Sequence, residues 1–116
     1  MVENFEQITR ELTKDEKMLI PILTEGLKKR SKDNPVKAPE IIKGINKYYG
    51  RKVISEPRLR KLCNLLRSTG MLPIIATSKG YYVSYDTEVI KSQIRSLKDR
   101  ANAILASAEG LGKWTT

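Results

Sequence analysis

The stretch from Ser55 to Gly70 constrains the fold more than any other part of this chain, because it carries a helix start, a helix stop and two chemically different faces. Ser55, Glu56 and Pro57 all favour the first turn of a helix. Gly70 favours the left-handed conformation that follows the last turn. The apolar side chains form a stripe of about 100°, made of Leu59, Leu62, Cys63 and Leu66. The opposite face is polar and basic, with Pro57, Arg60, Lys61, Asn64, Arg67 and Ser68.

This pattern predicts a helix over 56–69 with one packed face and one face that presents hydrogen-bond donors. Two short β-rich runs, 71–77 and 81–84, follow it and flank a small polar turn that carries Lys79. We therefore expect an antiparallel hairpin with this lysine at its tip. Strand alternation places Tyr81 inward and Tyr82 outward.

A first helix is predicted near the start of the chain, where Thr13 and Glu16 have the spacing of a capping box. Apolar residues at helical spacing continue from there to about Arg30. Pro21 falls within this run. Because a proline removes one backbone hydrogen bond and crowds the preceding turn, we expect a kink or a delayed start rather than two separate helices.

A second helix is predicted to begin at 38–40, where Pro39 suits the first turn, and to stop at Gly50. Just before it, Val36 can start a strand of one or two residues. At the very start of the chain, residues 3–12 place apolar side chains at helical spacing. Both a short docked helix and a frayed tail are open for this segment.

A last helix is predicted from a cap at Asp86 or Thr87 to about Glu109. Its apolar positions alternate in steps of four and three residues, which is a heptad seam. Such a seam can pack against the first helix of the same chain or against a second copy. We favour the second copy, because the period persists further than a small domain needs. The expected homodimer residues are Ile90, Ile94, Leu97, Ala101, Ile104 and Ala108.

Charge is distributed unevenly along the chain. Lys and Arg total 22 against 13 Asp and Glu, which gives a net charge of +9. Residues 1–50 hold ten basic and eight acidic side chains, whereas 51–84 hold seven basic and one acidic. The positive field therefore centres on the predicted basic helix and hairpin. Such a field favours polyanions, but charge alone does not distinguish DNA from RNA or from an acidic protein.

The residue types needed for most enzyme chemistry are scarce. The chain has no histidine and one cysteine, Cys63, which lies on the apolar face of the basic helix. This composition provides no zinc-ligand cluster and no histidine-assisted nucleophile, and no glycine-rich phosphate loop is present. We expect no enzyme activity, no cofactor and no metal. The sequence also lacks a long apolar run and a signal peptide, so we expect a cytoplasmic protein with no membrane partner.

The order of the predicted helices, together with the Ser-Lys-Gly-Tyr-Tyr-Val sequence at 78–83, resembles the winged helix-turn-helix family of DNA-binding domains. More specifically, the chain is similar to small winged-helix proteins carried by phages and prophages. The resemblance covers about residues 13–85. It implies that helix 56–69 enters the major groove and that the wing at 77–80 touches the flanking backbone or minor groove.

The expected fold is thus mainly α with a small β-hairpin, a winged helix-turn-helix plus a long C-terminal helix. Four segments follow: 1–12 as tail or short helix, 13–85 as the winged-helix domain, 86–109 as the C-terminal helix, and 110–116 as a flexible tail. The expected partner is double-stranded DNA, bound by a transcriptional regulator or by a phage-type replication or packaging accessory. A protein-interaction module and an RNA-binding protein are the alternatives. The expected DNA-binding residues are Pro57, Arg58, Arg60, Lys61, Asn64, Arg67, Ser68, Thr77, Ser78 and Lys79.

Overall fold

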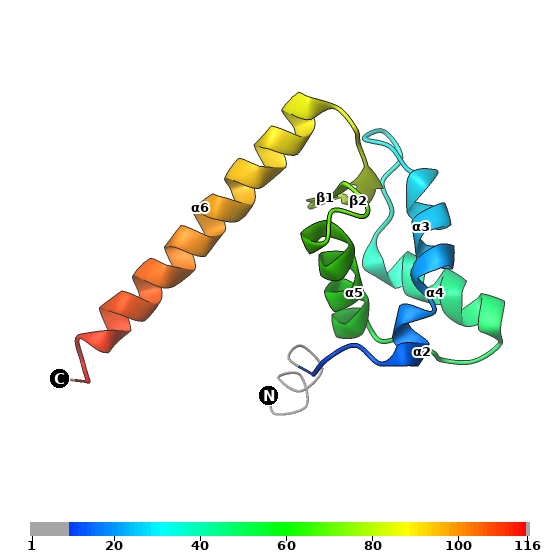
Figure 1. Cartoon of the computed structure of the whole chain (residues 1–116), viewed down its shortest axis with the longest axis horizontal. Coiled ribbons are helices and arrows are strands. Elements are labelled where there is room, and N and C mark those ends of the chain that lie inside the picture. The colour runs from blue at the N-terminus through cyan, green and yellow to red at the C-terminus, as the bar shows by residue number, and fades with distance from the viewer. Residues whose placement is uncertain (1–9, 116) are drawn as a thin grey trace. The chain divides into compact units, whose positions relative to one another are not determined.

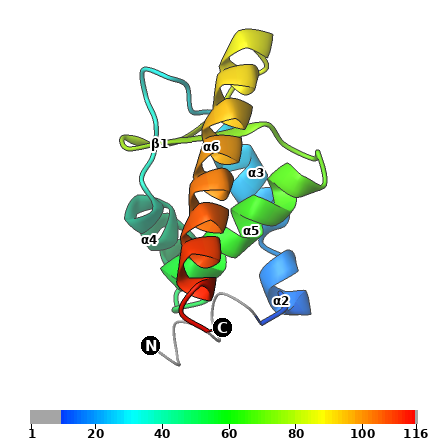
Figure 2. The ribbon, with the colours of Figure 1, turned by 90° about the vertical axis from the view of Figure 1, so that its left-hand side faces the viewer.

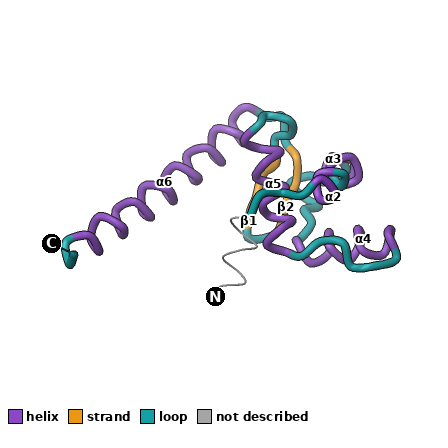
Figure 3. Tube along the Cα trace, turned by 60° about the horizontal axis from the view of Figure 1, so that its bottom comes forward, coloured by secondary structure: helices purple, strands orange, loops and turns teal. Residues whose placement is uncertain are grey.

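The computed structural model of the protein describes residues 10–115. This part forms two compact units, of which the first ends at Ser84 and the second begins at Tyr85 (Figure 1). The described chain is mainly helical and contains one two-stranded antiparallel sheet (Figure 3). Most of the predicted tail or short helix at 1–12 lies outside the described residues.

The first unit begins with two short helices, α2 (Lys14–Lys17) and α3 (Ile20–Lys28). The predicted capping box is confirmed: the backbone N–H of Glu16 donates to Thr13 Oγ1 at 3.1 Å, and the N–H of Thr13 donates to Glu16 Oε1 at 2.8 Å. The prediction of one helix interrupted at Pro21 is wrong, because α2 ends at Lys17 and α3 begins separately. Pro21 lies in the first turn of α3, where a missing N–H breaks no helical bond.

The next two helices, α4 (Ala38–Tyr49) and α5 (Glu56–Ser68), begin where the sequence predicted, and α5 ends one residue before the predicted end at 69. A proline occupies the first turn of each, and Gly50 ends α4 in the left-handed conformation. Helix α4 contacts both α3 and α5. Ser55 stands at the N-cap position of α5, although its side chain makes no capping hydrogen bond.

A hairpin of β1 (Ile74–Thr77) and β2 (Gly80–Val83) follows α5, as predicted. Strand β1 contacts α5, and β2 contacts α3. The predicted short strand before α4 is present as a single bridge between Val36 and Tyr81. The N–H of Val36 donates to the Tyr81 carbonyl at 2.9 Å, and the N–H of Tyr81 donates back at 2.7 Å. The hairpin is therefore held against the segment that connects α3 to α4.

The core of the first unit is built on the predicted apolar stripe of α5, whose leucines 59, 62 and 66 are fully buried. Tyr81 packs against this core, as strand alternation predicted, and so does Val83, two residues further along the strand. The prediction of an outward Tyr82 is wrong, because only 7% of this residue is exposed. It lies directly opposite the buried Ile75, so two bulky side chains share the second face of the hairpin.

The second unit is one unbroken helix, α6 (Thr87–Gly112), shown in Figure 2. Asp86 caps it, because its Oδ1 accepts the N–H groups of Glu88 and Val89 at 2.8 and 3.3 Å. The helix continues three residues past its predicted end at Glu109, so the start of the predicted flexible tail is helical. No residue of α6 is buried. Over residues 10–115, no helix combines the length and the apolar character that crossing a membrane requires.

Gly80 provides a stability test of this packing. Its φ is 130°, and an added Cβ would lie 2.6 Å from the carbonyl carbon and oxygen of Val36. We expect Gly80→Ala to lower the free energy of unfolding by about 2 kcal/mol or more. The new side chain would strain the backbone at this positive φ, and it would push the Val36 backbone away from the hairpin.

The matched control is Gly44→Ala, in the interior of α4, where an added Cβ has no neighbour within 4 Å. Removing a helical glycine there should raise the free energy of unfolding by about 0.5–1 kcal/mol. Urea denaturation of both variants measures the difference. Equal changes of the same sign would contradict the placement of Gly80 against Val36.

Candidate nucleic-acid interface

Arg58 is not part of the exposed face of α5, and its predicted role in DNA binding is wrong. Only 3% of the residue is exposed. Its Nε and Nη2 donate to the two carboxylate oxygens of Glu16 at 2.7 and 2.8 Å, and Nη1 and Nη2 donate to the carbonyls of Arg10 and Glu11. At 100° per residue, Arg58 lies about 40° from Leu62, so the helical phase already placed it beside the apolar stripe.

The Arg58–Glu16 pair is ionised on both sides at neutral pH. The hydrogen-bonded guanidinium of Arg58 lowers the pKa of Glu16 to about 2, against the opposing effect of burial and with help from the N–H and hydroxyl of Thr13. In turn, the carboxylate raises the pKa of Arg58. The glutamate of the α2 capping box is therefore also the counter-ion of Arg58 in α5. Because its charge is neutralised internally, Arg58 adds little to the outward positive field.

Arg67 also has a structural contact. Its Nε donates to the carbonyl of Ile74 at 3.0 Å, and the side chain is half-buried. This bond joins the last turn of α5 to the first residue of β1. The predicted phosphate contact of Arg67 stays a prediction, but part of the guanidinium holds the hairpin in place.

The remaining predicted residues of α5 share one outward face. Arg60, Asn64 and Ser68 are exposed, and Pro57 and Lys61 are half-buried. Their spacing of three or four residues places them along one side of the helix. Arg60 Nη2 contacts Glu56 Oε1 at 2.6 Å, in a solvent-exposed pair of the kind that contributes little stability.

The turn of the hairpin presents a second set of exposed polar groups, Thr77, Ser78 and Lys79. The Thr77 hydroxyl donates to the Gly80 carbonyl at 3.1 Å and accepts the N–H of Lys79 at 3.2 Å. This side chain therefore shapes the turn, while the side chain of Lys79 stays exposed. We call the following set the basic surface: Arg60, Lys61, Asn64, Ser68, Thr77, Ser78 and Lys79.

Arg51 and Lys52 are two further basic residues beside the basic surface that were not among the predicted DNA-binding residues. Both are exposed in the loop that leads into α5. The signal that could have found them is their position, since a basic loop directly before a candidate recognition helix is well placed for phosphate contacts.

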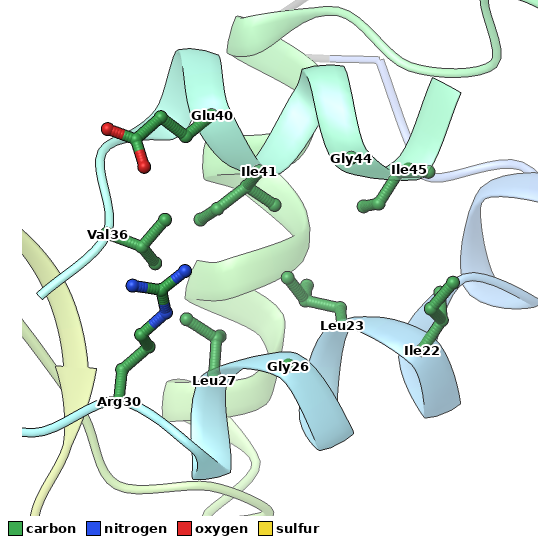
Figure 4. A pocket seen from close by; sticks show the side chains of 10 residues that line it. All are labelled: Ile22, Leu23, Gly26, Leu27, Arg30, Val36, Glu40, Ile41, Gly44 and Ile45. Atoms are coloured by element: carbon green, nitrogen blue, oxygen red, sulfur yellow. The ribbon is translucent and has the colours of Figure 1, made fainter. Parts of the chain in front are cut away.

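A groove of about 300 Å³ lies between α3 and α4 (Figure 4). Apolar side chains form most of its wall, and Arg30 and Glu40 lie at one end. Gly26 and Gly44 leave the two helix backbones uncovered there, since an added Cβ at either would meet no atom within 4 Å. None of the predicted DNA-binding residues lines this groove. Within residues 10–115, His, Cys, Asp and Glu form no group of three that could hold a metal ion.

The pKa of Glu16 generates a pH prediction. Its folded value of about 2 lies below the ordinary 4.5, so the carboxylate stabilises the fold fully above pH 4.5. Between pH 4.5 and 2 the unfolded chain binds a proton that the folded chain does not, and the stabilisation is lost as the pH falls. We expect Glu16→Gln to cost roughly 3 kcal/mol at pH 7 and much less at pH 3, measured by urea denaturation. A cost that does not change with pH would contradict the ionised pair.

The predicted residues that stay exposed thus form a basic surface built on α5 and on the hairpin turn. The buried leucines and Arg58 hold α5 in the core of the first unit. Arg67 and the bridge between Val36 and Tyr81 hold the hairpin. Comparison of the chain with protein-family models, with curated proteins and with solved structures found no match.

Proposed function

We propose that the protein is a winged helix-turn-helix protein that binds double-stranded DNA through the basic surface. The order of elements supports this fold: α3, the bridging residue Val36, α4, α5 and then the hairpin. In that arrangement α5 is the recognition helix and the 78–79 turn is the tip of the wing. Regulation of transcription, or an accessory role in replication or packaging, is the kind of process that such binding serves.

The observation that carries the proposal is the division of α5 into a fully buried face and an exposed polar face. A helix of 13 residues fits the major groove, which is about 12 Å wide. Asn64 lies near the middle of the exposed face, and an Asn amide matches the donor and acceptor of adenine. Lys61, one turn before it, has the reach for guanine acceptors.

The charge that reaches solvent also supports binding to a polyanion. Of the seven basic residues in 51–84, Arg58 is neutralised by Glu16 and Arg67 is partly engaged with Ile74. The other five basic residues are Arg51, Lys52, Arg60, Lys61 and Lys79. Residues 51–84 contain one acidic residue, Glu56. A positive field of this kind favours phosphate backbones.

Duplex DNA is favoured over RNA by what the basic surface contains. Side chains cannot read the deep, narrow major groove of an RNA duplex, and single strands are bound chiefly by stacking on aromatic side chains. The basic surface has no aromatic residue, because Tyr82 is buried. The second candidate function is a protein-interaction module, and the observation in its favour is the apolar groove between α3 and α4.

Asn64→Ala tests the proposal. On a duplex selected from a random pool, we expect this variant to lose about 1–3 kcal/mol of binding free energy, because the adenine contact is removed. On an unrelated duplex the loss should be small. Fluorescence anisotropy with both duplexes, with competing single-stranded DNA and RNA, measures the effect. Unchanged binding to every sequence would show that α5 does not read bases.

Two matched variants separate base contacts from phosphate contacts in the same assay. Lys79→Ala should weaken both duplexes alike and make the salt dependence shallower by about one unit. Lys28→Ala removes an exposed lysine from the end of α3, outside the basic surface, and should leave both affinities and the salt dependence unchanged. Equal effects of these two substitutions would remove the wing from the interface.

A further inference from the structure

Helix α6 carries an apolar stripe whose large side chains are exposed to solvent. The helix has 26 residues, and the exposed fractions of Ile94, Leu97 and Ile104 are 43%, 38% and 70%. Leu111, which continues the same stripe, is 71% exposed. A long helix with an uninterrupted apolar seam gains stability chiefly by burying that seam against another element.

We propose that α6 pairs with α6 of a second copy of the chain and that the two helices run antiparallel. The sizes of the seam residues favour the antiparallel over the parallel orientation. Along the seam, large Ile or Leu residues occupy one heptad position throughout, whereas the other position holds Ile94, Ala101 and Ala108. In an antiparallel pair each layer combines the two positions, so that a large residue faces a small one in most layers.

One of two equivalent antiparallel registers pairs six of the seven stripe residues, all except Leu111. With Leu97 facing Ala101 of the second copy, Ile94 faces Ile104 and Ile90 faces Ala108. These contacts repeat on the other side of the two-fold axis, which gives six layers. Every residue from Ile90 to Ala108 on the stripe then meets another residue of the stripe. Four of the six layers pair an alanine with Ile or Leu, and no layer holds two alanines.

A parallel pair gives a poorer fit. Each residue would then face its own copy, so Ala101 would meet Ala101 and Ala108 would meet Ala108. The neighbouring Leu97 and Ile104 layers would hold the helices too far apart for these alanines to touch. The result would be cavities at the alanine layers, each of which costs stability.

One pair of opposite charges along α6 meets in the antiparallel register, although Lys98 lies near its own copy across the two-fold axis. Lys91 and Lys98 lie beside the seam in the N-terminal half, and Glu109 lies on the same flank in the C-terminal half. Antiparallel pairing brings Glu109 alongside Lys91 of the second copy. Parallel pairing would leave the two about 27 Å apart along the axis, at 1.5 Å per residue over 18 residues. The proposed pairing of α6 is independent of the proposed DNA binding, because it involves none of the residues of the basic surface.

Sedimentation of the full chain at micromolar concentration tests the pairing. We expect about twice the chain mass of 13.2 kDa. The double variant Leu97→Lys and Ile104→Lys places charge in the seam and should sediment as a folded monomer, with dimerisation weakened more than a hundredfold. Its matched control, Ser92→Lys and Ala103→Lys, adds the same charge to exposed positions on the opposite side of the helix and should remain a dimer. A monomeric parent chain would overturn the proposal.

Spin-label distances in the dimer test the orientation. In the antiparallel register, labels on Asn102→Cys should lie within about 25 Å of each other, whereas labels on Lys113→Cys should lie about 40 Å apart. In a parallel dimer both distances would be short, and that result would overturn the antiparallel assignment. Cys63 should take up no label, because it is buried and its pKa is raised to about 11. The parent chain is the control for this background.

Discussion

The buried pair of Arg58 and Glu16 is the interaction on which the arrangement of the first unit depends. It joins the glutamate of the α2 capping box to the first turn of α5, across 42 positions of sequence. Arg58 also donates to the carbonyls of Arg10 and Glu11. A buried ion pair adds little net stability compared with apolar packing, but the loss of one partner leaves an uncompensated charge and is costly. The pair therefore acts mainly as a constraint on orientation: with Arg58 turned inward, the phase of α5 is fixed.

That phase decides which residues α5 can offer to a ligand. Leu59, Leu62 and Leu66 fill the core on the same side as Arg58, so Lys61 and Asn64 face away from it. Arg67 then links the end of α5 to β1, and Val36 links β2 to the segment before α4. The basic surface is thus carried by elements that are each tied to the same core, which suits a surface that must keep its shape while it binds.

Local signals account for the parts of the fold that the sequence predicted. The capping box at Thr13, the glycines after α4 and α5, and the polar turn between two β-rich runs each act within a few residues. The helical phase placed Arg58 beside the apolar stripe, but its ion pair could not be predicted from local signals, because Glu16 is distant in sequence and already had a local role in the capping box. Pro21 was misjudged because a proline inside an apolar run is compatible with a kink or with a new helix start, and only the surrounding packing decides between them.

A dimer paired through α6 would carry two basic surfaces, one from each copy of the chain. Pairing of α6 would also raise the effective concentration of the second DNA-binding unit once the first is bound.

We propose that the outward face of α5 and the hairpin turn contact DNA. Amide chemical shifts of the isotope-labelled full chain, recorded as a selected duplex is added, test this claim most directly. The account predicts that the largest changes lie at Lys61, Asn64 and Ser68 and at residues 77–79, with small changes at Ile41 and Ile45 in the groove between α3 and α4. Changes centred on that groove, with none along the outward face of α5, would contradict it.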